Sequence, residues 1–334
     1  GTLPVIIARL AEQFGHATAL ISAEEHLSYR DLAARVRYYA QWAIDQRLGK
    51  GDVVCLLMQN CPDYLAIWLG ITRVGSIVAL LNTNLRGAAL RHSIALVAPR
   101  HAIVGEGLHD AYISLRNYIW PDTNWWTHKT NVTGLPRVDD TSAFRSSHAE
   151  DMQQLPNISD TALYLYTSGT TGLPKAAPIS HYRLMQWTHW FAGMMNTTPA
   201  DRMYNCLPMY HSVGGIVATG ATLVGGGSLV LRQKFSAREF WPDITEWDCT
   251  LFQYIGEICR FLLKSPVRTD EKRHRIRLAC GNGLAGGIWE EIQERFQIPH
   301  VLEFYASTEG NVSLYNCEGQ IGAVGRLPPF ISHR

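Results

Sequence analysis

The first hundred residues alternate between short apolar runs and longer amphipathic stretches. The predicted helices cover residues 4–14, 30–48, 62–74 and 86–97, and the predicted strands cover residues 17–21, 25–29, 53–58, 76–81 and 101–104. The helices follow from apolar side chains at helical spacing, and the later strands from continuous apolar runs. Because these elements alternate with short connections, the pattern predicts a parallel sheet with helices on its faces.

The same alternation returns after Lys175. The predicted helices there are 181–195, 237–246, 257–263 and 288–296, and the predicted strands are 203–207, 228–232, 250–254, 276–280 and, as the final strand, 301–305. One more predicted strand, 161–166, precedes the lysine. Residues 110–160 are polar, turn-rich and irregular, and we interpret them as a surface connection between two lobes. The sequence therefore predicts an α/β fold with two doubly wound lobes, residues 1–155 and 156–334, whose mostly parallel sheets carry helices on both faces.

Composition narrows the function classes. The 334 residues suffice for two domains, and 30 basic against 29 acidic residues without a basic stripe argue against a nucleic acid partner. Seven dispersed cysteines are typical of buried thiols in a reducing cytosol. The most apolar region, residues 65–81, is interrupted by Arg73 and is too short to span a bilayer. We expect a cytoplasmic protein without a signal peptide; peripheral membrane contact and oligomeric state stay open.

A stretch dense in hydroxyls and glycines, TSGTTGLPK, follows a predicted strand and closes on a lysine. Glycines let backbone N–H groups approach an anion, hydroxyls donate hydrogen bonds, and lysine adds a cation. An exposed loop is the alternative, but this combination favours phosphate binding. It is not a Walker A loop, because Pro174 precedes the lysine and Ala176 follows it. The predicted phosphate ligands are Thr167, Ser168, Gly169, Thr170, Thr171, Gly172 and Lys175.

Two further turns with unusual chemistry follow predicted strands. Thr308 and Glu309 place a hydroxyl beside a carboxylate, which suits Mg²⁺ and a phosphate oxygen, and Tyr305 could stack on a purine. The alternative is a helix N-cap pair with the tyrosine in the core. At 281–283, two glycines flank an asparagine and permit a flat ring to approach the backbone, or form an ordinary turn. Because ligands gather at the carboxyl ends of strands in such sheets, we hypothesise that the three turns line one crevice.

The stretches at 164–175 and 305–309 resemble the signatures of the adenylate-forming superfamily, with Ala306 where its members usually have glycine. Over residues 27–326 the chain looks like one branch, the fatty acid transport protein/very-long-chain acyl-CoA synthetase family. The matching phrases are LNTNLRG at 81–87, FQYIGEICR at 252–260, GNGL at 281–284, RF at 295–296 and TEGN at 308–311. At 285–287 the chain has Ala-Gly-Gly where the branch tends to have Arg-Pro-Asp.

The resemblance implies an ATP-dependent fatty acid–CoA ligase that activates a long or very long chain acid through acyl-AMP. It implies ATP, Mg²⁺ and CoA as cofactor and co-substrates. Lys175, Thr308 and Glu309 would be catalytic, with Glu309 on the metal, and the residues that hold adenine and the α-phosphate would be Gly281, Asn282, Gly283, Tyr305 and Thr308. His211 and Gly214 would line the acyl site, although core packing is the alternative for the apolar segment 214–224.

Other functions stay open at this stage. They are a ligase for another hydrophobic, bile or carnitine-like acid, an enzyme that stops at acyl-AMP, and a non-catalytic acyl or nucleotide-binding module in fatty acid uptake. Members of the branch continue through a ribose-binding Asp, a hinge and a small C-terminal domain with a catalytic Lys. Because the chain ends at Arg334, we expect it to be the large N-terminal domain without the C-terminal lid, to hold nucleotide weakly, and to turn over poorly unless extended.

Overall fold

The computed structural model describes residues 1–115, 118, 122–140, 155–168, 173–310 and 312–327. The chain divides into two compact units. Unit 1 comprises Gly1–Ala17, Leu27–Gln186 and Met209–His211, and unit 2 comprises Thr18–His26, Trp187–Pro208 and Ser212–Arg334. Each unit has its own sheet and its own apolar core.

Unit 1 is built on one mostly parallel sheet. Its strands within the described residues are β3 (Val53–Leu57), β4 (Ile77–Leu80), β5 (His101–Gly105), β6 (Asn124–His128), β7 (Thr161–Ser168) and β8 (Pro174–Ser180). They lie in the order β6-β5-β3-β4-β7-β8, and only the β7–β8 pair among them is antiparallel. The helices are α1 (Leu3–Phe14), α2 (Tyr29–Asp45), α3 (Pro62–Arg73), α4 (Gly87–Ala95) and α5 (His109–Ile113).

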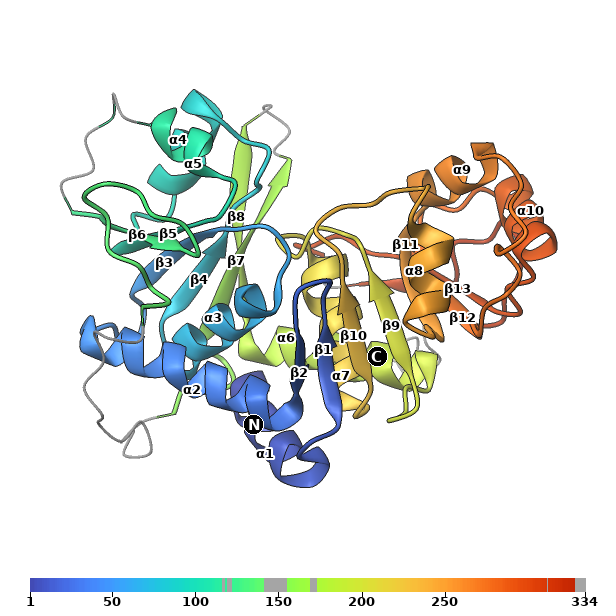
Figure 1. Cartoon of the computed structure of the whole chain (residues 1–334), viewed down its shortest axis with the longest axis horizontal. Coiled ribbons are helices and arrows are strands. Elements are labelled where there is room, and N and C mark those ends of the chain that lie inside the picture. Colours follow the sequence, from blue (N-terminus) through green and yellow to red (C-terminus); the bar gives the residue numbers. More distant parts are fainter. Residues whose placement is uncertain (116–117, 119–121, 141–154, 169–172, 311, 328–334) are drawn as a thin grey trace. The chain divides into compact units, whose positions relative to one another are not determined.

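Helices cover both faces of this sheet, with α4 and α5 on one side and α2 and α3 on the other (Figure 1). Alternate residues of β3 point to one face, so Cys55 and Leu57 join Leu90 and Ile94 of α4 in a single core. Helix α2 begins with a capping box between Ser28 and Asp31, which satisfies backbone N–H groups at its start. These local signals explain why the predicted helices formed where the sequence placed them.

Unit 2 carries a larger sheet. The strands are β1 (Thr18–Ile21), β2 (His26–Ser28), β9 (Arg202–Asn205), β10 (Ser228–Leu231), β11 (Leu251–Ile255), β12 (Leu278–Asn282), β13 (Val301–Tyr305) and β14 (Leu314–Asn316). In the described part of the chain their order is β14-β13-β12-β11-β9-β10-β1-β2, and the boundary between the units falls inside β2. The pairs from β1 to β13 are parallel, whereas β14 runs antiparallel to β13.

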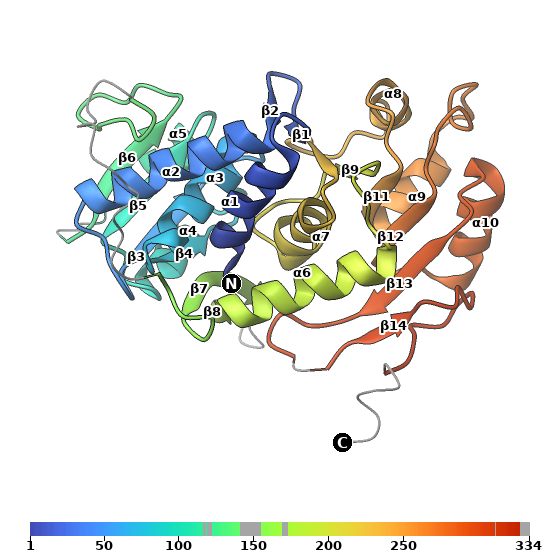
Figure 2. The ribbon, with the colours of Figure 1, turned by 90° about the horizontal axis from the view of Figure 1, so that it is seen from below.

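Helices also cover both faces of the second sheet (Figure 2). They are α6 (His181–Met195), a π-helical segment (Val213–Ala218), α7 (Thr219–Val224), α8 (Phe240–Glu246), α9 (Gly256–Lys264) and α10 (Gly286–Phe296). One core gathers buried side chains of α8, α9 and α10 against β9 to β12, among them Phe240, Ile258 and Trp289. On the other face, Phe191 of α6 packs edge-on against Phe304, with ring centroids 4.8 Å apart. The predicted α/β class with helix-covered, mostly parallel sheets is confirmed.

Among the described residues, the sequence analysis missed three strands, β6, β8 and β14, and part of β8 lies in the predicted phosphate loop. Strand β6 lies inside 110–160, which we had interpreted as irregular connection, and it pairs in parallel with β5 along five residues. The Trp126 indole of β6 packs edge-on against Trp42 and donates a hydrogen bond to His101 Nδ1 at 2.9 Å. Strand β14 follows β13, so the prediction that 301–305 is the final strand was wrong. All three are edge strands, whose existence depends on a partner strand rather than on an apolar run.

The division of the chain also differs from the predicted boundary at 155/156. Strand β7 pairs with β4, and β8 pairs with β7, so both extend the sheet of unit 1. The boundary between the units therefore falls inside α6, after Gln186, and residues 18–26 belong to unit 2 because β1 pairs with β10. Long-range strand pairing, which a linear pattern does not reveal, sets this division.

Candidate functional site

The turn at residues 281–283 closes the carboxyl end of β12. Gly283 has a backbone φ of +81°, a conformation that glycine adopts without steric cost. Gly281 is required for a different reason, because a Cβ there would overlap the Tyr254 carbonyl oxygen and come within 2.5 Å of the Tyr254 ring. The side-chain Oδ1 of Asn282 is buried and has no hydrogen-bond partner among the described residues. Packing and backbone conformation thus explain the two glycines, and the close ligand approach at this turn stays a prediction.

A buried carboxylate lies beneath this turn. Glu303 of β13 is 3% exposed, and its Oε1 accepts hydrogen bonds from the backbone N–H of Gly283 at 2.6 Å and of Leu284 at 3.1 Å. Its Oε2 accepts from the Tyr254 hydroxyl at 2.5 Å. Burial raises the pKa of Glu303, and these hydrogen bonds oppose the shift. The sequence analysis missed this residue, although a lone Glu in an apolar strand was a usable signal.

The segment after β13 carries the residues that we predicted for purine, phosphate and metal. Tyr305 is 62% exposed, so its ring is not part of the core. Thr308 is half-buried, Glu309 is exposed, and Gly310 N–H donates to the Ser307 carbonyl at 3.1 Å to close a turn. Because β12 and β13 are parallel neighbours, this segment and the 281–283 turn leave the sheet at the same edge. Unit 2 therefore brings these two of the three predicted turns together.

The predicted phosphate loop begins at the end of β7 and ends in β8, two paired strands of unit 1. Thr167 is paired with Lys175 across the two strands, and Ser168 with Pro174. The Lys175 side chain is exposed, on a strand rather than in a loop. The Pro174 carbonyl contacts His92 Nε2 of α4 at 3.1 Å, which fixes one side of the hairpin. Gly169, Thr170, Thr171 and Gly172 lie outside the described residues.

The two residues predicted for the acyl site are in different units. His211 is exposed, and its ring lies against that of Tyr210 with centroids 4.6 Å apart. Gly214 is buried, and a Cβ there would come within 2.7 Å of the Pro208 carbonyl oxygen. Its own carbonyl accepts from Asn205 Nδ2 at 3.0 Å and from Thr219 Oγ1 at 2.9 Å. Core packing, the alternative that we gave for this segment, accounts for the glycine.

Metal-ligand chemistry is sparse in the described residues, where no group of three His, Cys, Asp or Glu side chains could hold an ion. A Mg²⁺ site at Glu309 would thus rely on one carboxylate together with phosphate oxygens and water, a common arrangement for this ion. The described helices also include none that is long and apolar enough to cross a membrane.

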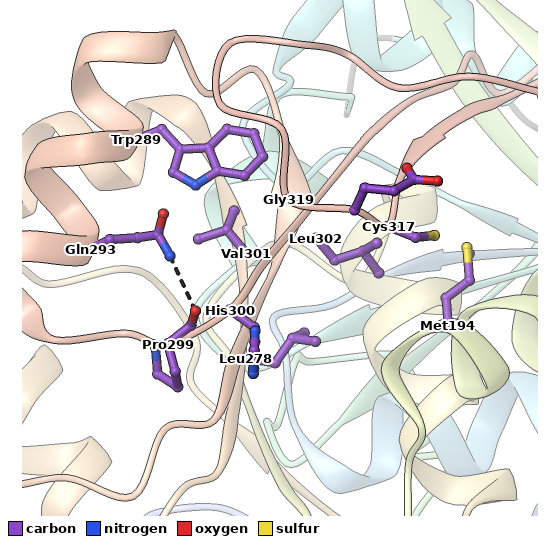
Figure 3. Close-up of a pocket in the computed structure, with 11 residues that line it drawn as sticks. Met194, Leu278, Trp289, Gln293, Pro299, His300, Val301, Leu302, Cys317 and Gly319 are labelled. Carbon is purple, nitrogen blue, oxygen red and sulfur yellow. Dashed lines mark hydrogen bonds between the residues drawn. The ribbon is translucent and has the colours of Figure 1, made fainter.

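A pocket of about 250 Å³ lies elsewhere in unit 2. Leu278 and Val301, the first residues of β12 and β13, line it, so it opens at the amino ends of these strands and away from the 281–283 turn. Figure 3 shows Trp289 and Gln293 of α10 on one side and Cys317 and Met194 on the other. No residue predicted for the nucleotide or the acyl chain lines this pocket.

Comparison with known proteins shows similarity along nearly the whole chain. It is 36% identical over 343 residues to long-chain fatty acid transport protein 1 of Mus musculus, covering 99% of this chain and 52% of that protein. It is 34% identical over 310 residues to the medium/long-chain-fatty-acid–CoA ligase FadD6 of Mycobacterium tuberculosis, covering 92% of this chain and 50% of that protein. The chain thus spans about half the length of these curated relatives.

A solved structure also has a similar fold over nearly the whole chain. The crystal structure of ATP-bound MatB from Rhodopseudomonas palustris superposes with a TM-score of 0.82 at 26% identity, over 97% of this chain and 65% of that one. The sequence model of the AMP-binding enzyme family matches residues 7–332. That match covers nearly the whole chain and includes every residue predicted for the site. The chain belongs to the AMP-binding enzyme family.

Proposed function

We propose that this chain is the nucleotide- and acyl-binding portion of an AMP-forming fatty acid–CoA ligase for long or very long chain acids. The observation that carries the proposal is similarity along 99% of the chain to a long-chain fatty acid transport protein, joined by similarity along 92% of it to a fatty-acid–CoA ligase. The structure supports it through the two turns that leave β12 and β13 at one edge of the sheet.

The described residues fit a nucleotide at that edge. At Gly283 a Cβ would meet Gly256 N only at 3.8 Å, so the backbone there is open to a flat ring, whereas Tyr254 fills the space at Gly281. The exposed Tyr305 ring is free to stack on that flat ring. Thr308 would contact the α-phosphate, and the exposed Glu309 carboxylate would hold Mg²⁺. Asn282 would border the adenine. In unit 1, residues 167–175 would bind the phosphates, with Lys175 as their cation.

The reaction depends on the alignment of the two reactants and on neutralisation of the phosphate charge more than on proton transfer. A fatty acid carboxylate is ionised near pH 7 and can attack the α-phosphorus without a general base, releasing pyrophosphate and forming acyl-AMP. Protein groups would align the two anions and offset their repulsion. When bound, Mg²⁺ would neutralise part of the phosphate charge. In the second step the thiol of CoA would displace AMP. His211 and Gly214 stay our proposal for contacts with the acid.

The first step can be tested by pyrophosphate–ATP exchange that depends on added acid. We expect exchange with long-chain acids, and we expect Lys175→Ala and Glu309→Gln each to lower its rate about 10²- to 10³-fold through loss of charge stabilisation. Two controls match these changes in charge. Lys50→Ala removes an exposed cation of unit 1, and Glu290→Gln removes an exposed carboxylate of α10; both should retain exchange within about twofold.

Other outcomes would point to other functions. Exchange with bile, short-chain or carnitine-like acids but not with long-chain fatty acids would show that the proposed substrate class is wrong. Acyl-AMP formation without CoA transfer, even in a longer chain, would indicate an acyl-AMP ligase. Binding of ATP or fatty acid with no exchange under any condition would identify a non-catalytic module and refute the ligase proposal.

A further inference from the structure

Three residues form a row across neighbouring strands beneath the 281–283 turn. The sheet register pairs Tyr254 of β11 with Gly281 of β12, and Gly281 with Glu303 of β13, so the two outer side chains lie on one face. The outer strands are about 10 Å apart. Because Gly281 has no side chain, the Tyr254 ring lies across it and its hydroxyl reaches the Glu303 carboxylate. We call this row the Tyr254–Gly281–Glu303 brace.

The carboxylate of the brace is held by hydrogen bonds to the turn. Its three donors are the Tyr254 hydroxyl and the backbone N–H groups of Gly283 and Leu284. Within the described residues, the cost of burying this carboxylate is offset by hydrogen bonds and not by a cation. A buried carboxylate that loses a donor is costly, since water cannot replace it. Any displacement of the turn would break these bonds, so the brace holds the turn in one conformation.

A second contact holds the same turn from the other neighbouring strand. Gly256, the first residue of α9 after β11, lies so close that a Cβ there would come within 2.6 Å of the Gly283 carbonyl carbon. Gln253 Nε2 of β11 also donates to the Cys280 carbonyl at 2.8 Å. The turn is therefore fixed by β11 on one side and by β13 on the other, although neither strand contributes to the Gly-Asn-Gly sequence itself.

We propose that Glu303, oriented by Tyr254, is a positioning residue for nucleotide binding that sets the backbone of Gly283 and Leu284 in the shape that receives adenine. The inference rests on the proposed function, which assigns the turn to adenine. Glu303 does not touch the nucleotide in this scheme. It acts through the two N–H groups that it holds, so its loss should weaken ATP binding and leave binding of the acid unchanged.

Amide hydrogen exchange of the nucleotide-free chain tests the brace itself. Exchange at Gly283 and Leu284 should rise about tenfold or more in Tyr254→Phe and Glu303→Gln, because a bond to the carboxylate is lost or weakened. Exchange in β9 and β10 should not change. The matched control is Tyr204→Phe, which removes a buried hydroxyl bond to another carboxylate, Asp243 at 2.8 Å, in the same unit. Unchanged exchange at Gly283 and Leu284 in both brace variants would overturn the inference.

Titration calorimetry with MgATP tests the consequence for the ligand. We expect Tyr254→Phe and Glu303→Gln to raise the Kd of ATP about tenfold, Glu303→Ala to raise it further, and Tyr204→Phe to change it less than twofold. The Kd of the fatty acid should stay the same in all of them. If Glu303→Ala does not fold, the Kd values of Tyr254→Phe and Glu303→Gln still show whether the brace affects ATP binding.

Two failures are distinguishable in this experiment. If the wild-type chain binds ATP and the brace variants bind it as tightly as Tyr204→Phe does, the positioning role is refuted while the proposed function stands. If the wild-type chain binds no ATP, the proposed function fails and the assignment of the brace to adenine fails with it. Equal weakening of ATP and fatty acid binding would also refute the inference, because it indicates general loss of structure.

Discussion

At the scale of single residues, the turn after β12 shows how closely two backbones approach at the edge of the sheet. Gly256 starts α9, and a Cβ there would overlap the Gly283 carbonyl. Alanine usually stabilises a helix relative to glycine by about 0.5–1 kcal/mol. Here the overlap involves backbone atoms that cannot rotate away. The steric cost therefore outweighs the gain in helix propensity, and alanine at this position should destabilise the fold.

We therefore expect Gly256→Ala to lower the free energy of unfolding by about 1–3 kcal/mol. The control is Gly287→Ala in α10, where a Cβ would meet no atom within 4 Å. That variant should gain up to about 1 kcal/mol. Urea unfolding monitored by tryptophan fluorescence measures both. Equal stability of the two variants would contradict the predicted contact.

The residues of the candidate site were predictable to the extent that their chemistry is local. Thr308 and Glu309 stand side by side in the sequence, and the structure gives both at least partial access to solvent. Glu303 and Tyr254 are 49 residues apart, and only the β11–β12–β13 order brings them together. A residue that acts across a sheet leaves little local signal, which is why the brace was missed.

At the scale of elements, α10 is attached at its carboxyl end by one arginine. Arg295 donates from Nε and Nη2 to the two carboxylate oxygens of Glu271, at 3.1 and 2.9 Å, and from Nη1 to the Leu263 carbonyl at 2.7 Å. Glu271 is 1% exposed. This planar set of bonds joins α10 to the last turn of α9 and to the segment that follows it.

Lysine cannot reproduce the bonds of Arg295, because its ammonium group is a point charge on a flexible stem. We expect Arg295→Lys to cost about 2–4 kcal/mol of unfolding free energy, since it leaves a buried carboxylate poorly paired. Arg238→Lys alters an exposed pair with Glu239 and should change stability by less than about 0.5 kcal/mol. Denaturant melts compare the two, and a loss below 1 kcal/mol for Arg295→Lys would contradict the assigned role.

Elements with strong local signals were predicted closely, and those that depend on a partner were not. Helix α6 has the bounds that its periodicity indicated. Strand β6 contains Asn, Thr and His among its tryptophans, so its sequence reads as irregular, yet the edge of β5 offers it backbone partners. Strand β14 is three residues long and is likewise defined by its partner, β13.

At the scale of the whole molecule, buried histidines make stability depend on pH. His101 in β5 and His181 at the start of α6 are 3% and 1% exposed, and burial lowers the pKa of each to about 4. His101 Nδ1 also accepts the Trp126 indole hydrogen, which suits the neutral ring. An unfolded histidine titrates near 6.5, so the unfolded chain binds more protons between pH 6.5 and 4.

Stability should therefore be greatest above pH 6.5 and fall as the pH decreases towards 4. At pH 5 the difference in proton binding between the folded and unfolded chain lowers the free energy of unfolding by about 2 kcal/mol per histidine. Urea unfolding at pH 7.5 and pH 5 measures it, and His101→Gln with His181→Gln should flatten the dependence. His26→Gln, a change at an exposed position, should leave the slope as it is. An unchanged slope in the double variant would refute the assignment.

The sequence by itself determined the α/β class, most helices and buried strands, and the identity of the chemical turns, because periodicity, glycines and hydroxyls act within a few residues. Tertiary structure decided which strands share a sheet. It placed β7 and β8 with β4 and divided the chain inside α6. It also buried Glu303 under the 281–283 turn through pairing with β12. The physical reason is that strand pairing and burial join residues far apart in the chain, where local patterns carry little information.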